Sequence, residues 1–190
     1  MNIQQLEQLA QEVVEHLPGW EYVPPREGRQ EGTLRGEEEA GYRPELRIDE
    51  GHPASRLSIN FQFPGELYHH RPHDSGVKTS ITVSAEKDAS TIARDISRRL
   101  LPDATKYFRA TVARANQAKQ YRLNTLEAAR QLGEATGLTF SEPRSNTEYP
   151  HAWSSGPVYG ITVSGPDSVH FEAFTCTLEQ AKTIVLAVRS

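Results

Sequence analysis

The chain has 190 residues, of which 36% are hydrophobic, and a formal net charge of −4. This length suits one large domain or two small ones. The single cysteine, Cys176, excludes an internal disulfide framework and a cysteine-based zinc site. No stretch approaches the ~20 consecutive apolar residues that a membrane-spanning helix needs. The first five residues also lack the basic-then-apolar order of a secretion signal, so we expect a cytoplasmic protein.

The first half of the chain predicts a helix followed by strands. Apolar residues recur at helical spacing over residues 3–16, and short apolar runs at 20–23 and 46–48 are typical of strands. The clearest strand is 57–63, where apolar and polar residues alternate, and a further strand is expected over 77–83. The glycine-rich and acidic stretch between residues 26 and 42 predicts a mobile loop or a widened hairpin tip.

The longest helical periodicity lies in residues 89–137. Ser90 is a predicted N-cap, and Pro102 predicts a kink or a break because proline removes a backbone donor. Asp103 is then expected to cap a second helix, which Gly137 should end.

Positive charge is concentrated in the same stretch, whereas residues 1–50 contain twelve acidic residues and five arginines. Between residues 94 and 122 there are eight basic residues and two acids. This asymmetry indicates a dipolar molecule with one face that attracts an anionic partner. A solvated connecting helix is the alternative interpretation. The predicted binding residues in this helical stretch are Arg94, Arg98, Arg99, Lys106, Arg109, Arg114, Lys119 and Arg122.

The second half repeats the order of the first. A helix is expected over 123–135, strands over 158–163 and 169–173, and a final helix that Thr177 caps. The sequence of residues 161–164 repeats that of residues 81–84. We therefore predict an α+β fold, a tandem duplication of a helix–three-stranded antiparallel sheet–helix unit joined by a long basic helix. The predicted domains are residues 1–102 and 123–190, with 103–122 as the connecting helix.

The order helix, antiparallel strands, helix resembles the topology of the double-stranded-RNA-binding domain. In that family a turn between the first strands and a basic last helix contact the RNA. Gly51-His52-Pro53 falls in a comparable turn, with its residues in a different order, and the first unit's last helix offers Arg94, Arg98 and Arg99. The resemblance implies contact with nucleic acid, and it adds His52 to the predicted binding residues.

A second resemblance concerns Arg98-Arg99-Leu100-Leu101-Pro102 and the alanine- and arginine-rich stretch after it. This pattern is similar to small uncharacterised proteins of bacterial phages and plasmids. It implies an accessory role for a mobile element, such as blunting a host defence.

A histidine-rich loop follows residue 68 and contains His69, His70, His73 and Asp74. Neutral imidazole and carboxylate groups are good ligands for zinc and similar ions, so these residues are a candidate metal site. The alternative is an exposed hairpin tip that becomes positive below neutral pH.

Catalytic signatures are missing from the sequence, which has no glycine-rich phosphate loop, no Gly-x-Ser-x-Gly and no His-Glu-x-x-His. We therefore predict a non-enzymatic binding protein without a cofactor, whose partner is a protein or a nucleoprotein. One alternative is a metal-dependent hydrolase or nuclease that uses the histidine-rich loop. Another is a structural homodimer in which the bare sheet faces meet.

Overall fold

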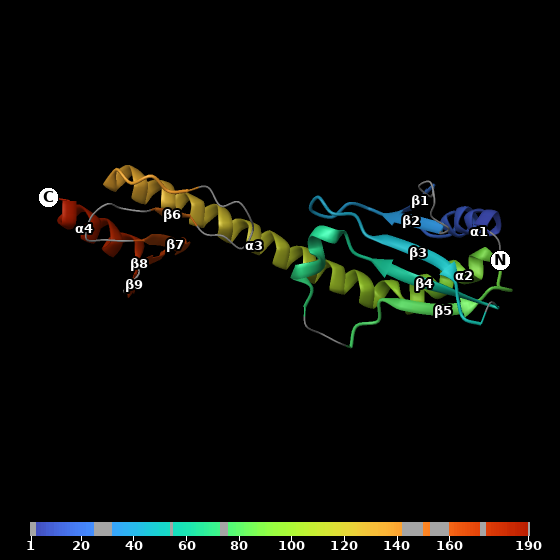
Figure 1. The fold of residues 1–190 in the computed structure, drawn as a ribbon. Helices are drawn as coiled ribbons and strands as arrows, with labels where there is room; N and C mark the ends of the chain where they lie inside the picture. Colours follow the sequence, from blue (N-terminus) through green and yellow to red (C-terminus); the bar gives the residue numbers. More distant parts are fainter. Residues whose placement is uncertain are drawn as a thin grey trace. The chain divides into compact units, whose positions relative to one another are not determined.

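A computed structural model describes residues 3–24, 32–53, 55–72, 76–141, 150–152, 160–171 and 174–189. The chain divides into two compact units, Met1–Ala115 and Asn116–Ser190. Each unit combines helix with an antiparallel sheet (Figure 1), which confirms the predicted α+β class. The division falls inside the stretch 103–122 that the sequence predicts as a connecting helix. Among the helices that the structure describes, none has the length and apolar character needed to cross a membrane.

Unit 1 is built on a five-stranded antiparallel sheet in which neighbours in sequence are neighbours in space. Its elements are α1 (Ile3–Val14), β1 (Trp20–Val23), β2 (Gly32–Gly36), β3 (Glu45–Glu50), β4 (Arg56–Gln62), the 3-10 helix η1 (Gly65–His70), β5 (Ser80–Ser84), α2 (Ala89–Arg99) and the first part of α3 (Leu101–Thr136). The predicted three-stranded unit is therefore wrong. The sheet has one strand more than the four strand-like runs of the first half, because β2 forms inside the stretch expected to be a loop. This glycine-rich strand is held by pairing with β1 on one side and β3 on the other.

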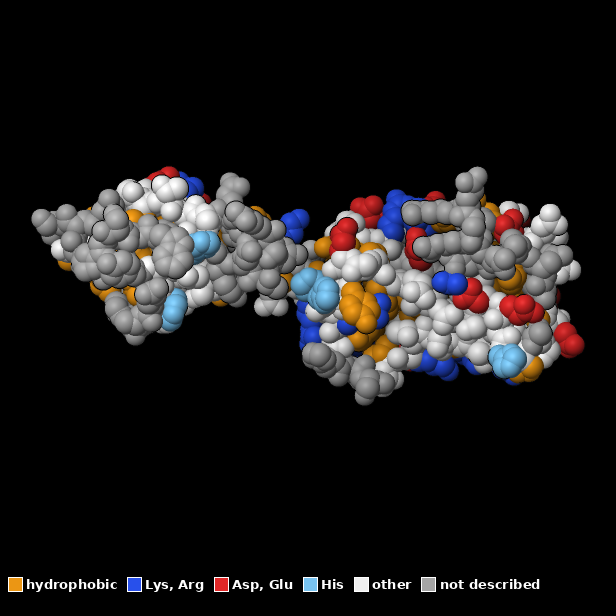
Figure 2. All heavy atoms as spheres, viewed as in Figure 1, with side chains coloured by type: hydrophobic (Ala, Val, Ile, Leu, Met, Phe, Trp, Pro, Cys, Tyr) orange, Lys and Arg blue, Asp and Glu red, His pale blue; other side chains and the backbone are white. Residues whose placement is uncertain are grey.

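The sheet of unit 1 has one apolar face and one polar face. Ile48, Ile59 and Ile81 are paired across β3, β4 and β5 and are buried. Apolar residues of α1, α2 and α3 belong to the same core cluster. The alternate residues of these strands are polar, and Figure 2 shows white, basic and acidic side chains over β3 and β4. One face of the sheet is therefore covered and the other is solvated, as the alternation over 57–63 predicts.

Two of the predicted helix boundaries are confirmed. The helix breaks at Leu100, and Pro102 lies in the first turn of α3, where its missing backbone N–H is not needed. Gly137 has a φ of +70° and directly follows the last residue of α3. The predicted N-caps of α2 and α3 are wrong. Asp88, not Ser90, is the N-cap of α2, and Asp103 lies within the first turn of α3 rather than before it.

Unit 2 contains a four-stranded antiparallel sheet, again with more strands than predicted. Its elements are the last part of α3, β6 (His151–Ala152), β7 (Ile161–Gly165), β8 (Ser168–Phe171), β9 (Phe174–Cys176) and α4 (Leu178–Arg189). A separate core cluster joins residues of α3, the sheet and α4. The helix expected over 123–135 is not a separate element, because α3 continues through it without a break.

The repeated four-residue sequence occupies different places in the two sheets. Residues 81–84 belong to β5, which is an edge strand, whereas residues 161–164 belong to β7, which lies between β6 and β8. The similarity between the units is therefore one of element order and not of equivalent strands.

The approach of α1 to β2 generates a prediction at Gly32. A Cβ atom there would lie 2.8 Å from the Ala10 Cβ and 3.2 Å from the Leu6 carbonyl oxygen. We expect Gly32→Ala to lower the free energy of unfolding by about 1–3 kcal/mol, because the backbone of α1 has to move. Gly65→Ala is the control, since a Cβ atom at Gly65 meets nothing within 4 Å. Urea unfolding measures both variants, and equal midpoints would contradict the packing described here.

Candidate binding surface on α2 and α3

A buried carboxylate organises the basic residues of α2. Asp95 is 7% exposed, although carboxylates are rarely buried without a partner. Its oxygens lie 2.6 Å from Lys87 Nζ, 3.6 Å from Arg99 Nη1 and 3.7 Å from Arg98 Nη2. The two arginines reach Asp95 because residues three and four apart share a helix face. Three cations around one carboxylate leave an excess of positive charge at this place.

The same contacts set the protonation state of Asp95. A hydrogen bond from the Lys87 ammonium lowers the pKa of Asp95, and the charges of Lys87, Arg99 and Arg98 lower it further, against the effect of burial. Asp95 is therefore ionised at neutral pH. An ionised Asp95 attracts the ends of three long side chains that would otherwise move independently.

The other basic residues of unit 1 differ in how far they are neutralised. Arg94 is exposed and lies one turn before Arg98 on the same side of α2. Lys106 and Arg114 are exposed on α3. Within the described part of the chain, none of Arg94, Lys106 and Arg114 forms an ion pair. These charges are free to act on a partner.

Arg109 of α3 differs from Arg94, Lys106 and Arg114 because it pairs with an acid. Its Nε lies 3.0 Å from an oxygen of Glu39, which belongs to the connection between β2 and β3. The acidic N-terminal part of the chain thus neutralises one arginine of the predicted set. Because the Arg109 side chain is 66% exposed, this pair contributes little to stability.

The remaining predicted binding residues are distributed elsewhere. Lys119 and Arg122 belong to unit 2, where Lys119 is exposed and Arg122 is half-buried. His52 is exposed in the turn between β3 and β4. In that turn the Ser55 carbonyl accepts a hydrogen bond of 2.9 Å from the Ala85 backbone N–H. The turn that contains His52 therefore lies beside the segment that leads into α2.

The predicted metal ligands are only partly described. His69 is exposed and His70 is half-buried at the end of η1, whereas His73 and Asp74 lie outside the described residues. In the ranges that the structure describes, no three His, Cys, Asp or Glu side chains come together as a metal site would require. The metal hypothesis therefore gains no support from this part of the chain.

Lys87 is a residue of the surface that the sequence reasoning missed. It precedes α2, so helical spacing could not connect it with Asp95. A signal was nevertheless present, because Asp95 lies between Ile92 and Ile96 on the buried side of the helix. A carboxylate at such a position requires a cation, and Lys87 is the nearest one before the helix.

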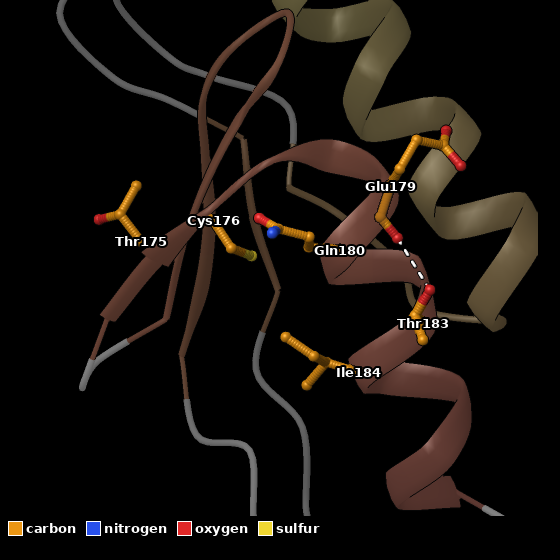
Figure 3. Close-up of a pocket in the computed structure, with 6 residues that line it drawn as sticks. All are labelled: Thr175, Cys176, Glu179, Gln180, Thr183 and Ile184. Carbon is orange, nitrogen blue, oxygen red and sulfur yellow. Dashed lines mark hydrogen bonds between the residues drawn. The ribbon is translucent and has the colours of Figure 1, made fainter.

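Unit 2 contains an open cavity of about 570 Å³ between β9 and α4 (Figure 3). It is lined by Thr175, Cys176, Glu179, Gln180, Thr183 and Ile184. Figure 3 shows Cys176, Gln180 and Ile184 directed toward one another. Burial raises the pKa of the Cys176 thiol, so the thiol is protonated at neutral pH and is a poor nucleophile.

His170 and Cys176 lie on two paired strands. On one continuous strand, the rise over six residues would separate them by about 20 Å. The chain instead turns back between β8 and β9, and His170 Nδ1 lies 2.9 Å from Thr175 Oγ1. The predicted capping box is confirmed, with hydrogen bonds of 3.0 Å and 3.3 Å between Thr177 and Gln180.

Comparison with protein-family models, with curated proteins and with solved structures finds no match to this chain. A function must therefore be inferred from the chemistry of its surfaces.

The position of Asp95 generates a prediction about stability and pH. We expect Asp95→Asn to lower the free energy of unfolding by about 1–3 kcal/mol at pH 7, because three cations lose their counter-charge. The pKa of Asp95 is lowered in the folded protein, so its contribution is complete above the unfolded value of about 3.9 and is lost as pH falls through the folded value. Urea unfolding at pH 7, 5 and 3 should therefore show a difference that shrinks at pH 3.

The control is Glu86→Gln, which removes an exposed carboxylate close to Lys87 in sequence. Its unfolding midpoint should stay near that of the unaltered protein at all three pH values. A pH-independent difference for Asp95→Asn would show that packing, and not charge, explains the effect.

Proposed function

We propose that the chain is a non-enzymatic protein that binds an anionic macromolecule, a nucleoprotein or an acidic protein. The contact surface is formed by Lys87, Arg94, Arg98 and Arg99 around α2, which we call the α2 surface. The observation that supports it most is the arrangement of three cations around buried Asp95. It leaves positive charge uncompensated at a fixed place on a folded scaffold.

Preorganisation is the physical reason that this arrangement favours binding. A flexible lysine or arginine loses side-chain entropy when it contacts a partner, and this loss opposes association. At the α2 surface a hydrogen bond of 2.6 Å to Asp95 already restricts Lys87, and Arg99 and Arg98 lie within 3.7 Å of the same carboxylate. Arginine adds selectivity for phosphate and carboxylate, because its planar guanidinium group donates two parallel hydrogen bonds to such groups.

Two acids of the loop before β3 are already neutralised. Glu39 pairs with Arg109, and Glu38 pairs with Arg43 at 3.3 Å. These pairs leave Arg109 and Arg43 less available to an anionic partner than the cations of the α2 surface. Charge complementarity at the α2 surface would accelerate association more than it raises affinity.

Two parts of the wider hypothesis rest on the sequence. The order helix, antiparallel sheet, helix in both units supports a proposed tandem duplication. A cytoplasmic role as a phage or plasmid accessory or anti-defence factor rests on the resemblance of residues 98–102.

The described residues offer no observation in favour of a metal-dependent hydrolase. A homodimer through the uncovered sheet face of unit 1 is not favoured either, because the strand positions facing away from the core are mostly polar.

Charge reversal tests the α2 surface. The probes are a fluorescein-labelled DNA duplex of 20 base pairs and poly-glutamate, measured by anisotropy from 50 to 300 mM salt. We expect Arg94→Glu with Arg98→Glu to weaken binding at least tenfold and to reduce the salt slope by about one for each lost contact. The more strongly bound probe indicates the class of partner.

Lys78→Glu is the matched control, because it makes the same charge change at an exposed position before β5. Arg94→Glu alone is compared with it directly. Binding that does not vary with salt, or an equal loss in both single variants, would show that the α2 surface is not the contact.

A further inference from the structure

An arginine at the end of η1 is held between two aromatic rings. The guanidinium carbon of Arg71 lies 4.5 Å from the ring centroid of Phe63 and 4.8 Å from that of Tyr68. The Nε of Arg71 is buried and has no hydrogen-bond acceptor among the described residues. No described carboxylate forms an ion pair with Arg71 either. Among the described residues, the two rings and not an anion hold this cation in place.

The rings are fixed to the core of unit 1. Phe63 contacts Tyr107 at 5.5 Å and Phe108 at 5.9 Å between ring centroids. The Tyr107 hydroxyl donates a hydrogen bond of 2.6 Å to the Pro72 carbonyl, which ties the residue after Arg71 to α3. Leu67 anchors η1 because its side chain is fully buried. Tyr68 and Arg71 therefore form a preorganised pair, which we call the η1 platform.

Tyr68 is a large aromatic residue whose side chain is mostly exposed to solvent. Its exposed fraction is 63%, the highest among the exposed large hydrophobic residues of the described chain. Arg71 lies over its ring, and the His69 ring stands at 86° to it with centroids 5.7 Å apart. At the place of η1, Figure 2 shows an orange patch with blue atoms at its edge and pale blue histidine beside it. An aromatic surface next to a cation with no described anionic partner is thus open to solvent.

Further cations lie on the adjoining side of α3. Arg114 follows Tyr107 by seven residues, which places it on the same helix face, about 10 Å along the axis. Lys106 is next to Tyr107, and both cations are exposed. Glu66 in η1 and Asp103 in α3 are exposed acids of the same elements. Among these described residues the three cations Arg71, Arg114 and Lys106 outnumber the two acids.

We propose that the η1 platform binds single-stranded nucleic acid, with a base stacked on Tyr68 and a phosphate contacted by Arg71. Each base has a flat face that suits an exposed aromatic ring, and each nucleotide supplies the anion that Arg71 lacks. An acidic peptide would use Arg71 but has no need of the exposed ring. The η1 platform shares no residue with the α2 surface and does not depend on its function.

The test uses the intact chain and a fluorescein-labelled oligothymidylate of 12 nucleotides, with a strand of the same length that has abasic sugars. We expect Tyr68→Ala to weaken binding about 5- to 150-fold, the loss that follows when one stacked base is released. Tyr68→Phe should bind within twofold of the unaltered protein, because stacking needs the ring and not the hydroxyl. The abasic strand should bind weakly to all variants.

Arg71→Gln tests the phosphate contact. Its affinity for the oligothymidylate should fall, and its salt slope should become shallower by about one. Arg43→Gln is the control, since Arg43 is exposed and already pairs with Glu21 at 3.1 Å. Urea unfolding of each variant separates a lost contact from a lost fold.

Three results would overturn the proposal. One is an unchanged affinity in a folded Tyr68→Ala. Another is an Arg71→Gln variant that loses only stability, which would show that Arg71 merely covers the ring of Phe63. The third is displacement of the strand from the η1 platform by poly-glutamate at equal charge concentration, which would assign the site to an acidic protein. Failure of the α2 surface is distinguishable, because charge reversal there should leave the Tyr68-dependent preference for the oligothymidylate over the abasic strand unchanged.

Discussion

A cluster of aromatic rings determines where the functional residues of unit 1 lie. Phe61 and Phe63, at the end of β4 and just after it, contact Phe108 of α3 with centroids 6.0 Å and 5.9 Å apart. This contact fixes the rotation of α3 against the sheet, since a helix that buries Phe108 must present Lys106 to solvent. The same ring of Phe63 supports Arg71. The apolar core therefore positions charged groups that it does not itself contain.

Asp95 poses the opposite problem, a charge on the buried side of a helix. A hydrophobic residue there would pack without an electrostatic cost, and buried ion pairs are often no more stabilising than such replacements. What Asp95 provides is position, because Lys87, Arg98 and Arg99 converge on it from two segments of the chain. We expect a buried carboxylate like Asp95 where gathering cations at one place matters more than a small gain in the free energy of unfolding.

The sequence predicts features that depend on neighbouring residues and fails on those that depend on distant ones. The alternation over 57–63 and the stops at Pro102 and Gly137 are local, and the structure confirms them. By contrast, β2 has low intrinsic strand propensity and exists because two strands flank it. Cap selection is an exception, because it is local and was still wrong. Asp88 accepts hydrogen bonds of 2.8 Å and 2.6 Å from Thr91 and Ser90, so Ser90 donates to the cap.

The same contrast applies to the candidate sites. Their basic residues could be identified in the sequence, but the spatial arrangement of these residues could not. Neither the contact of Lys87 with Asp95 nor the stacking of Arg71 can be read from helical spacing. The two surfaces also differ in physics. Added salt weakens binding at the α2 surface, because the release of counterions on binding becomes less favourable. Stacking on Tyr68 depends little on salt. A partner that used both surfaces would therefore keep a residual, base-dependent affinity at salt concentrations that abolish the electrostatic contact.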